Sequence, residues 1–474
     1  MTDTSIAVIG GGFTGSLLAI HLLRKAPPGT HVYLLDRSGR FGSGLAYGTE
    51  HAGHLLNAPA GRMSAFDDRP RDFLNWLQRR SKQVLAGVVP SEGAFVPRQL
   101  YGAYLRDLLL DALCGAAPDT LTLLHDDVLA IDEMTEGGEG TRLTLHLASG
   151  ERLPVDAAVV AGGNFPAVPV LPNDAALRRS RRWRPDPWAN DAMHGLDPTA
   201  PVVLLGTGLT MVDCTVSLLA QGHAGPIHAL SRHGLLPLAH TVLPAAAAPP
   251  QNWPRGLRAL MRLVRRRAQD AVTAGQPWQD VIDALRSVGQ ELWQAATPED
   301  RARFLRHVRP WWDVHRHRMA PAVATQIEGA LARGQLRVHA GRITGSTLAG
   351  EGVNVAFRPR GGGDPVALHV ARVVNCSGLA PDITKVSDPL LTSLLREGIA
   401  RADPLRLGLD VTPKGALRNR HGVASDRLFA VGTLTRGVFW EVTAVPDLRC
   451  QCEAVARHLR ARLQPVMRRA KALV

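Results

Sequence analysis

Cysteine is scarce in this chain, with 5 among 474 residues. A framework of disulfides is typical of much shorter secreted domains with paired cysteines, so the sequence excludes that class and favours a reducing compartment. No run of about 18 apolar residues offers a membrane span, and no signal peptide is recognised before the first apolar strand, at 5–9. We therefore predict a cytoplasmic protein with no membrane partner.

Lysine is rare for so basic a chain, whose formal net charge is +13. It occurs at Lys25, Lys82, Lys385, Lys414 and Lys471. Nearly all of the positive charge is therefore arginine, which is scattered rather than gathered in a stripe or tail. We predict no nucleic-acid partner and keep nucleic-acid binding as a minor alternative. With 45% apolar residues and no glycine period, the chain is globular, and its length suggests two or three domains.

The N-terminal stretch carries the pattern G-x-G-x-x-G between an apolar strand, 5–9, and a helical run, 16–23. In such a unit the glycines allow a tight turn, the approach of a pyrophosphate and close packing of helix on strand, and the helix N-terminus attracts the phosphates. The next strand, 31–35, ends in an acid that can bind ribose hydroxyls. The predicted dinucleotide-binding residues are Gly10, Gly12, Phe13, Thr14, Gly15, Asp36 and Arg37.

A second unit of this kind begins near residue 201, with a strand at 201–205 and a helix at 209–220. Met211 stands where the third glycine would be, so we expect helix and strand to lie slightly farther apart. The next strand, 226–230, is followed by an arginine instead of an acid. That arginine can pair with a 2′-phosphate, which predicts NADPH, although it can also be a solvated loop residue. The predicted residues are Gly206, Gly208, Leu209, Thr210 and Arg232.

Two dinucleotide units in one chain indicate a flavin at one and a nicotinamide at the other, so that hydride can pass between them. The first unit suits FAD and the second NADPH. Apolar strands at 157–161 and 373–376, each followed by a proline (Pro166 and Pro381), would close the nucleotide domains. Another strand, 428–431, precedes a helix of about 447–463. Gly378 and Gly432 at strand ends are predicted cofactor contacts, and a plain core strand remains the alternative for the latter.

The predicted fold class is α/β, with two Rossmann-like domains. A discontinuous FAD domain is expected at 1–185 and 365–474, and an inserted NADPH domain at 186–364. Within the inserted domain, a stretch at about 253–333 is rich in helical pattern and broken by prolines, which predicts several short helices rather than one long one.

Over nearly its whole length the chain resembles the bacterial FAD/NAD(P)-binding oxidoreductases that include the FAD-dependent urate hydroxylases. It resembles the class B flavin monooxygenases more distantly. The segments that carry the resemblance are 10–15, 42–48, 54–59, 206–213, 231–235, 312–318 and 439–447. The resemblance implies FAD, a nicotinamide reductant and molecular oxygen, without naming the small molecule that is oxidised. The Baeyer–Villiger fingerprint F-x-G-x-x-x-H-x-x-x-W is absent, so no motif supports ester-forming chemistry.

The predicted function is therefore an FAD-dependent, NADPH-using monooxygenase that oxygenates a small organic molecule through a flavin C4a-hydroperoxide. Asn57 is a candidate partner of the flavin ring or the peroxide, and Glu441 a candidate charged group by the start of the last helix; their structural alternatives are a turn former and a cap. No metal site is predicted. The functional alternatives are an FAD-dependent NAD(P)H dehydrogenase or reductase without oxygen insertion, and a non-catalytic nucleotide-binding sensor.

A dithiol reductase is the nearest enzyme rival, and it needs two cysteines side by side near the flavin. Cys450 and Cys452 are close in sequence, but residues two apart on a helix point to different sides. Both are predicted to be ordinary buried residues.

Overall fold

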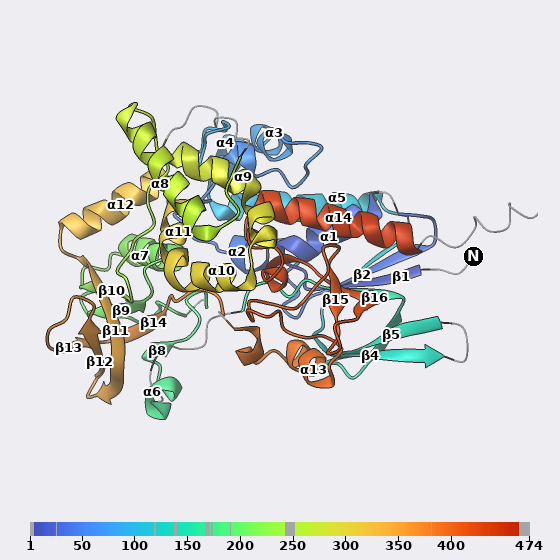
Figure 1. Cartoon of the computed structure of the whole chain (residues 1–474). Coiled ribbons are helices and arrows are strands. Elements are labelled where there is room, and N and C mark those ends of the chain that lie inside the picture. The colour runs from blue at the N-terminus through green and yellow to red at the C-terminus, as the bar shows by residue number, and fades with distance from the viewer. Residues whose placement is uncertain are drawn as a thin grey trace, which may run out of the picture. The chain divides into compact units, whose positions relative to one another are not determined.

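The structure is a computed structural model of the whole chain. It describes residues 4–24, 26–117, 120–136, 140–165, 171, 174–189, 191–241, 252–380 and 382–463, so Pro166 and Pro381 lie outside the described residues. The chain divides into two compact units. The first comprises Met1–Gly48, Pro59–Phe165 and Pro381–Val474, and the second comprises Thr49–Ala58 and Pro166–Ala380. Figure 1 shows the elements of both units in chain order by colour.

The first unit is built on a six-stranded sheet in the order β15-β16-β7-β1-β2-β3. Its strands are β1 (Thr4–Ile9), β2 (Thr30–Leu35), β3 (Leu121–Leu124), β7 (Ala157–Val160), β15 (Ala416–Arg418) and β16 (Ala424–Ala430). All neighbours pair in parallel except β15, which runs antiparallel at the edge. A parallel sheet is covered on both faces, which explains the unbroken apolar sequences of β1 and β7.

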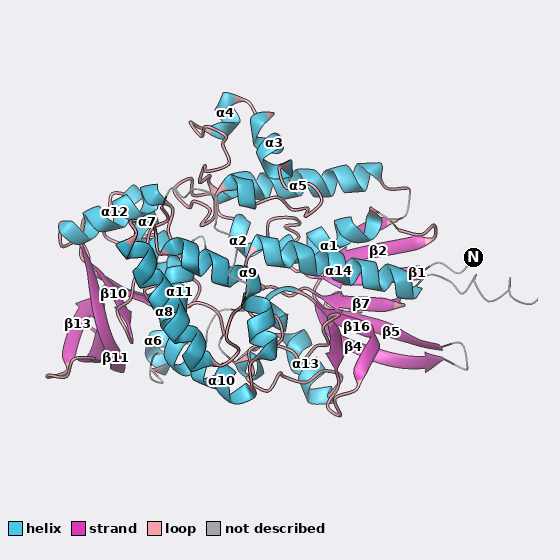
Figure 2. Cartoon of the chain, turned by 45° about the horizontal axis from the view of Figure 1, so that its top comes forward, coloured by secondary structure: helices cyan, strands magenta, loops and turns pink. Residues whose placement is uncertain are grey.

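Helices and a smaller sheet cover this central sheet. The helices are α1 (Phe13–Leu23), α2 (Gly44–Tyr47), α3 (Asp72–Gln78), α4 (Lys82–Leu85), α5 (Arg98–Gly115), α13 (Pro389–Glu397) and α14 (Val445–Leu463), with short turns η1 (Ala60–Arg62), η3 (Ile383–Lys385) and η4 (Gly432–Thr435). Helix α1 packs against both α5 and α14 (Figure 2). The antiparallel sheet β4 (Val128–Glu136), β5 (Gly140–Leu147) and β6 (Arg152–Val155) shares one hydrophobic core with β1, β7, β16 and α13.

The second unit is built on a seven-stranded sheet in the order β13-β12-β11-β10-β9-β14-β8. Its strands are β8 (Trp183–Arg184), β9 (Val202–Leu205), β10 (Ile227–Ser231), β11 (Leu336–Ala349), β12 (Gly352–Pro359), β13 (Val366–Val370) and β14 (Arg372–Asn375). The strands from β8 to β11 pair in parallel, and β12 and β13 add an antiparallel edge. In each unit the strand before the glycine loop lies between the next strand and a strand from far along the chain, so the predicted α/β class with two Rossmann-like sheets is confirmed.

The helices of the second unit are α6 (Ala175–Arg179), α7 (Leu209–Ala220), α8 (Leu257–Thr273), α9 (Gln279–Ala295), α10 (Pro298–Arg303), the π-helical turn η2 (Phe304–Val308), α11 (Arg309–Arg316) and α12 (Pro321–Ala332). As predicted, prolines separate the helices of this stretch. Each of Pro298, Pro310 and Pro321 occupies one of the first two positions of a helix. The stretch nevertheless holds two long helices, because α8 and α9 each run for 17 residues without an internal proline.

The boundaries between the units differ from the predicted ones. The chain passes between units at 165/166 and 380/381 instead of 185/186 and 364/365. At the first boundary β8 pairs with β14 inside the second sheet, and at the second boundary β13 and β14 still belong to that sheet. Residues 49–58 also belong to the second unit, which the sequence did not predict. None of the helices formed by the described residues is long and apolar enough to cross a membrane.

Candidate nucleotide sites

The first glycine loop brings α1 very close to the end of β1. Gly10 has a φ of +110°, and a Cβ there would lie 2.4 Å from the carbonyl oxygen of Ala161. A Cβ on Gly15 would lie 1.8 Å from the carbonyl oxygen of Gly10, so only glycine allows this approach. At Gly12, by contrast, the nearest atom to a Cβ is Gly44 Cα at 3.4 Å. A side chain at Gly12 would thus meet only an ordinary contact, and this part of the loop is where a pyrophosphate is expected.

The N-terminus of α1 is not capped by a side chain and has no acid in its first turn. Its N–H groups and positive dipole end are thus available to an anion. The carboxylate of Asp36, at the end of β2, accepts hydrogen bonds from the backbone N–H of Gly11 (2.8 Å) and of Ser38 (2.8 Å). These bonds fix the carboxylate beside the loop, as ribose recognition requires. The Arg37 guanidinium instead forms ion pairs, at 2.6 Å with the Asp388 carboxylate and at 3.5 Å with that of Asp127.

Gly432, which follows β16, lies beside this loop. It has a φ of +76°, and a Cβ there would lie 3.2 Å from Thr14 Oγ1. Its N–H donates to Gln451 Oε1 (2.8 Å), and Gln451 Nε2 donates to Thr435 Oγ1 (2.9 Å). The sequence analysis did not predict Gln451. Its position among the apolar residues of α14, where a buried polar side chain needs a partner, could have indicated it. The side chain of Phe13 is buried, so at that position only the backbone is offered to a cofactor.

The second loop repeats this geometry at the end of β9. Gly206 has a φ of +117°, and a Cβ there would lie 2.3 Å from the carbonyl oxygen of Cys376, just after β14. Gly208 has extended backbone, and a Cβ there would meet nothing within 4 Å among the described residues. Helix α7, which begins with Leu209 and Thr210, also lacks a side-chain cap and an acid in its first turn. Gly378, with a φ of +87°, follows the same strand end.

A cluster of positive charge lies at the end of β10, where the predicted 2′-phosphate site falls. Arg232 is exposed, and the next residue, His233, is hydrogen-bonded through Nδ1 to Arg360 Nη1. Burial, and then the positive charges of Arg360 and Arg232, lower the pKa of His233. The structure thus places two arginines around one imidazole. Arg360 was not predicted, because it follows β12 and is 127 positions from His233.

The two candidate catalytic residues belong to different units. Glu441 lies in the first unit, in the turn between η4 and α14, and is only 3% exposed. Asn57 lies in the second unit with an exposed side chain, and its carbonyl oxygen accepts a hydrogen bond from His240 Nε2 (2.9 Å). The first unit therefore holds Gly10, Gly12, Phe13, Thr14, Gly15, Asp36, Arg37, Gly432 and Glu441, and the second holds Asn57, Gly206, Gly208, Leu209, Thr210, Arg232 and Gly378.

The cysteines do not form the dithiol that a disulfide reductase needs beside the flavin loop. All five are free; Cys452 is buried, whereas Cys450 is exposed, so the prediction of burial was wrong for Cys450. In the second unit, Cys214 and Cys376 have their sulfur atoms 3.6 Å apart and are both buried. Burial, and then Cys214, raise the pKa of the Cys376 thiol well above its usual value. Such a thiol is a poor nucleophile.

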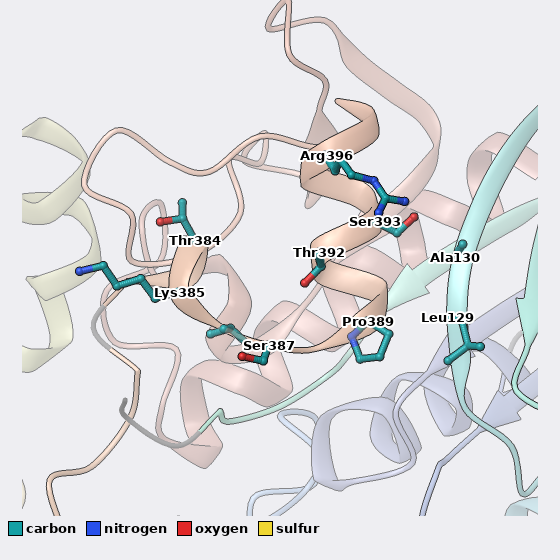
Figure 3. A pocket seen from close by; sticks show the side chains of 10 residues that line it. Leu129, Ala130, Thr384, Lys385, Ser387, Pro389, Thr392, Ser393 and Arg396 are labelled. Carbon is teal, nitrogen blue, oxygen red and sulfur yellow. The ribbon is translucent and has the colours of Figure 1, made fainter. Parts of the chain in front are cut away.

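A cavity of about 680 Å³ lies in the first unit between β4, η3 and α13. Its lining includes Lys385, Arg396 and four hydroxyl side chains, none of them a predicted site residue. Lys385 points away from Arg396 (Figure 3), so the two cations do not converge on one ligand. Among the residues that the structure describes, no cluster of three or more His, Cys, Asp or Glu side chains suits a metal ion. The residues at the two glycine loops, by contrast, fit FAD and NADPH.

Similarity to known proteins supports the predicted cofactors. Residues 7–165, which hold the first glycine loop, match the model of a family described as FAD-NAD(P)-binding. Over its whole length the chain is similar to an uncharacterised protein of Mycobacterium tuberculosis, with 23% identity over 97% of this chain and 96% of that protein. An L-aspartate N-monooxygenase (nitrosuccinate-forming) of Streptomyces cremeus is 28% identical over 49% of this chain and 39% of its own length.

Solved structures share the fold over nearly the entire chain. An ornithine hydroxylase from Pseudomonas aeruginosa has a TM-score of 0.67 at 17% identity, covering 98% of this chain and 100% of that one. An ornithine N-hydroxylase of Kutzneria sp. 744, reported with reduced FAD, NADP⁺ and L-ornithine, has a TM-score of 0.62 at 13% identity with the same coverage. The TM-scores of these structures, at identities below 25%, establish a common fold, and the predicted flavin and nicotinamide cofactors agree with the FAD-NAD(P)-binding description of the matching family model.

The two glycines of the second loop should respond differently to alanine. Gly206→Ala puts a Cβ against the Cys376 carbonyl at positive φ, so we expect it to lower the free energy of unfolding by about 2 kcal/mol, measured by urea denaturation. Gly208→Ala should leave stability within about 0.5 kcal/mol but raise the Kd for NADPH by roughly tenfold or more, because its methyl group occupies the pyrophosphate space. Equal NADPH affinity in Gly208→Ala would contradict the assignment of this loop.

Arg232 and Arg360 should make the protein prefer NADPH, which has a 2′-phosphate, to NADH, which has none. Arg232→Ala and Arg360→Ala should each raise the KM for NADPH by about tenfold or more, because a charge-assisted hydrogen bond of about 1.5–3 kcal/mol is lost. The KM for NADH should stay the same, since NADH has no 2′-phosphate. Arg358→Ala, an exposed arginine on the neighbouring part of β12, is the matched control and should change neither constant. A loss that is equal for both nucleotides would refute the phosphate assignment.

Proposed function

We propose that this protein is an FAD- and NADPH-dependent N-monooxygenase that hydroxylates the amino group of a small amino acid or related amine. The observation that carries the proposal is that α1 and α7 both start at a glycine loop without a side-chain cap. Beside α1 the carboxylate of Asp36 is held in place, and near α7 lie Arg232 and Arg360. The amine is favoured by the relatives, whose named substrates are aspartate and ornithine. Urate, the substrate of some members of the family that the sequence resembles, has no such amino group and is not favoured.

Each nucleotide site has its own task in binding. In the first unit, the start of α1 holds the FAD pyrophosphate beside Gly12, and Asp36 binds the adenosine ribose. In the second, the start of α7 holds the NADPH pyrophosphate beside Gly208, and Arg232 and Arg360 bind the 2′-phosphate. FAD, when bound, supplies the chemistry that side chains lack, namely acceptance of hydride and activation of oxygen.

The reaction balances as amine, NADPH, a proton and oxygen giving hydroxylamine, NADP⁺ and water. An amine attacks an electrophilic oxygen only when it is neutral, so the site needs a group that accepts the ammonium proton. We assign this role to the buried carboxyl group of Glu441. Asn57, whose amide both donates and accepts, is assigned the orientation of the reacting groups. The reducing cytoplasm predicted from the few cysteines is a compartment that supplies NADPH.

The direct test supplies purified protein with FAD, NADPH and air and compares L-aspartate, L-ornithine, L-lysine and urate. We expect one of the amines to give hydroxylamine product in equal amounts with the NADPH oxidised and the oxygen consumed. Oxidation of NADPH with an artificial electron acceptor, but without oxygen-dependent product for any amine, would indicate the dehydrogenase or reductase alternative. A protein that binds both nucleotides without consuming NADPH would be the sensor.

Replacing Glu441 tests its assigned role. Glu441→Gln keeps the shape but cannot accept a proton, so we expect kcat for the amine to fall by about a hundredfold at neutral pH while the Kd for NADPH is unchanged. The control is Glu453→Gln on α14, which removes the exposed ion pair with Arg457 and should leave kcat within about twofold. Normal turnover in Glu441→Gln would remove this residue from the mechanism.

A further inference from the structure

One short piece of chain leaves the first unit, joins the second and returns. We call it the tether segment, residues Thr49–Ala58. Its neighbours in sequence on both sides, up to Gly48 and from Pro59, belong to the first unit. The segment is therefore covalently joined to the first unit at both ends, while the contacts of Gly53, His54 and Asn57 described below attach it to the second unit. It also carries Asn57, the candidate orienting residue.

His54 anchors the tether segment on α7. Its ring is buried, with 5% of the residue exposed, and Nε2 lies 3.1 Å from the carbonyl oxygen of Asp213 and 2.8 Å from Ser217 Oγ. Nδ1 lies 2.8 Å from Thr49 Oγ1. Because a carbonyl oxygen can only accept, Nε2 carries a proton and donates to the Asp213 carbonyl on α7. Both ring nitrogens are thus engaged, Nε2 with α7 and Nδ1 with the Thr49 hydroxyl within the segment.

Further contacts fix the segment on either side of His54. The ring of His51 stacks on that of His54, with centroids 4.6 Å apart, and Trp188 meets His54 edge-on at 5.9 Å. Gly53 lies so close to α7 that a Cβ there would be 2.9 Å from Val216 Cγ1. At the far end, the Asn57 carbonyl accepts from His240. The segment is docked along its length and not at a single point.

The helix on which the segment docks is the one whose start is assigned to the NADPH pyrophosphate. We propose that His54 is a positioning residue for hydride transfer: by docking the tether segment on α7, it holds the nicotinamide-binding helix and Asn57 in a fixed relation. The inference rests on the proposed function, in which NADPH reduces FAD. Transfer rates fall steeply when reacting groups are misplaced by about 1 Å, so a loosened segment slows transfer while each nucleotide still binds its own loop.

The experiment combines hydrogen exchange with anaerobic stopped-flow reduction of the flavin, on the full-length holoenzyme. In His54→Ala we expect amides of the tether segment to exchange at least roughly tenfold faster, with β1 and β9 unchanged. The rate of flavin reduction by NADPH should fall by about tenfold or more, while FAD content and the Kd for NADPH stay within about twofold. Exchange is measured on the apoprotein too, so that it does not depend on turnover.

A paired substitution separates docking from general damage. Gly53→Ala should reproduce the slow reduction because its methyl group would lie 2.9 Å from both Val216 Cγ1 and His51 Cε1, and Gly53→Ala combined with Val216→Ala should restore part of the rate because one of these two clashes is removed. Gln221→Ala, an exposed residue just after α7, is the control and should behave as wild type.

Three results would overturn the inference. They are a His54→Ala variant that reduces flavin at the wild-type rate, tether amides whose exchange is unchanged, and a loss of NADPH affinity with faster exchange throughout the second unit, which is the signature of a merely structural histidine. If the wild-type flavin is not reduced by NADPH, the proposed function fails, and the positioning role fails with it. The exchange data would then still show whether His54 docks the segment, so the two failures are distinguishable.

Discussion

The closeness of two helices to the ends of two parallel strands is the constraint on which the rest of this structure depends. At Gly15 and at Gly206 a single added carbon would lie within 1.8 and 2.3 Å of a backbone oxygen. The absence of that carbon lets α1 start against the end of β1, and it lets the loop between β9 and α7 pass close to the end of β14. Both helix starts are left without a side-chain cap, so their N–H groups are open to water or to an anion such as a nucleotide phosphate.

Both units have a strand, a glycine loop and a helix in the same order, but they differ in the charge that follows their second strand. After β2 a carboxylate is held by backbone N–H groups, which suits ribose hydroxyls and repels a 2′-phosphate. After β10 two arginines surround His233, which suits that phosphate. In the function that we propose, this difference in charge corresponds to a nicotinamide donor in the second unit and a flavin acceptor in the first.

The sequence predicted what depends on local backbone geometry. The glycine loops, the strands that flank them and the proline-marked helix starts of the insertion all follow from residues that are neighbours in the chain. It did not predict Arg360, Gln451 or the membership of residues 49–58 in the second unit. Those depend on contacts between distant segments, for which spacing carries no signal. The burial of Cys450 was misjudged because its helix has one exposed side at that position.

The most direct measurement of the central claim is the anaerobic mixing of the purified protein with NADPH, and separately with NADH, while the visible flavin absorbance is followed. The account predicts a yellow protein with one FAD per chain, whose flavin is bleached completely by NADPH and much more slowly by NADH at equal concentration. A colourless protein that takes up no flavin, or a bound flavin that stays oxidised with NADPH, would contradict it.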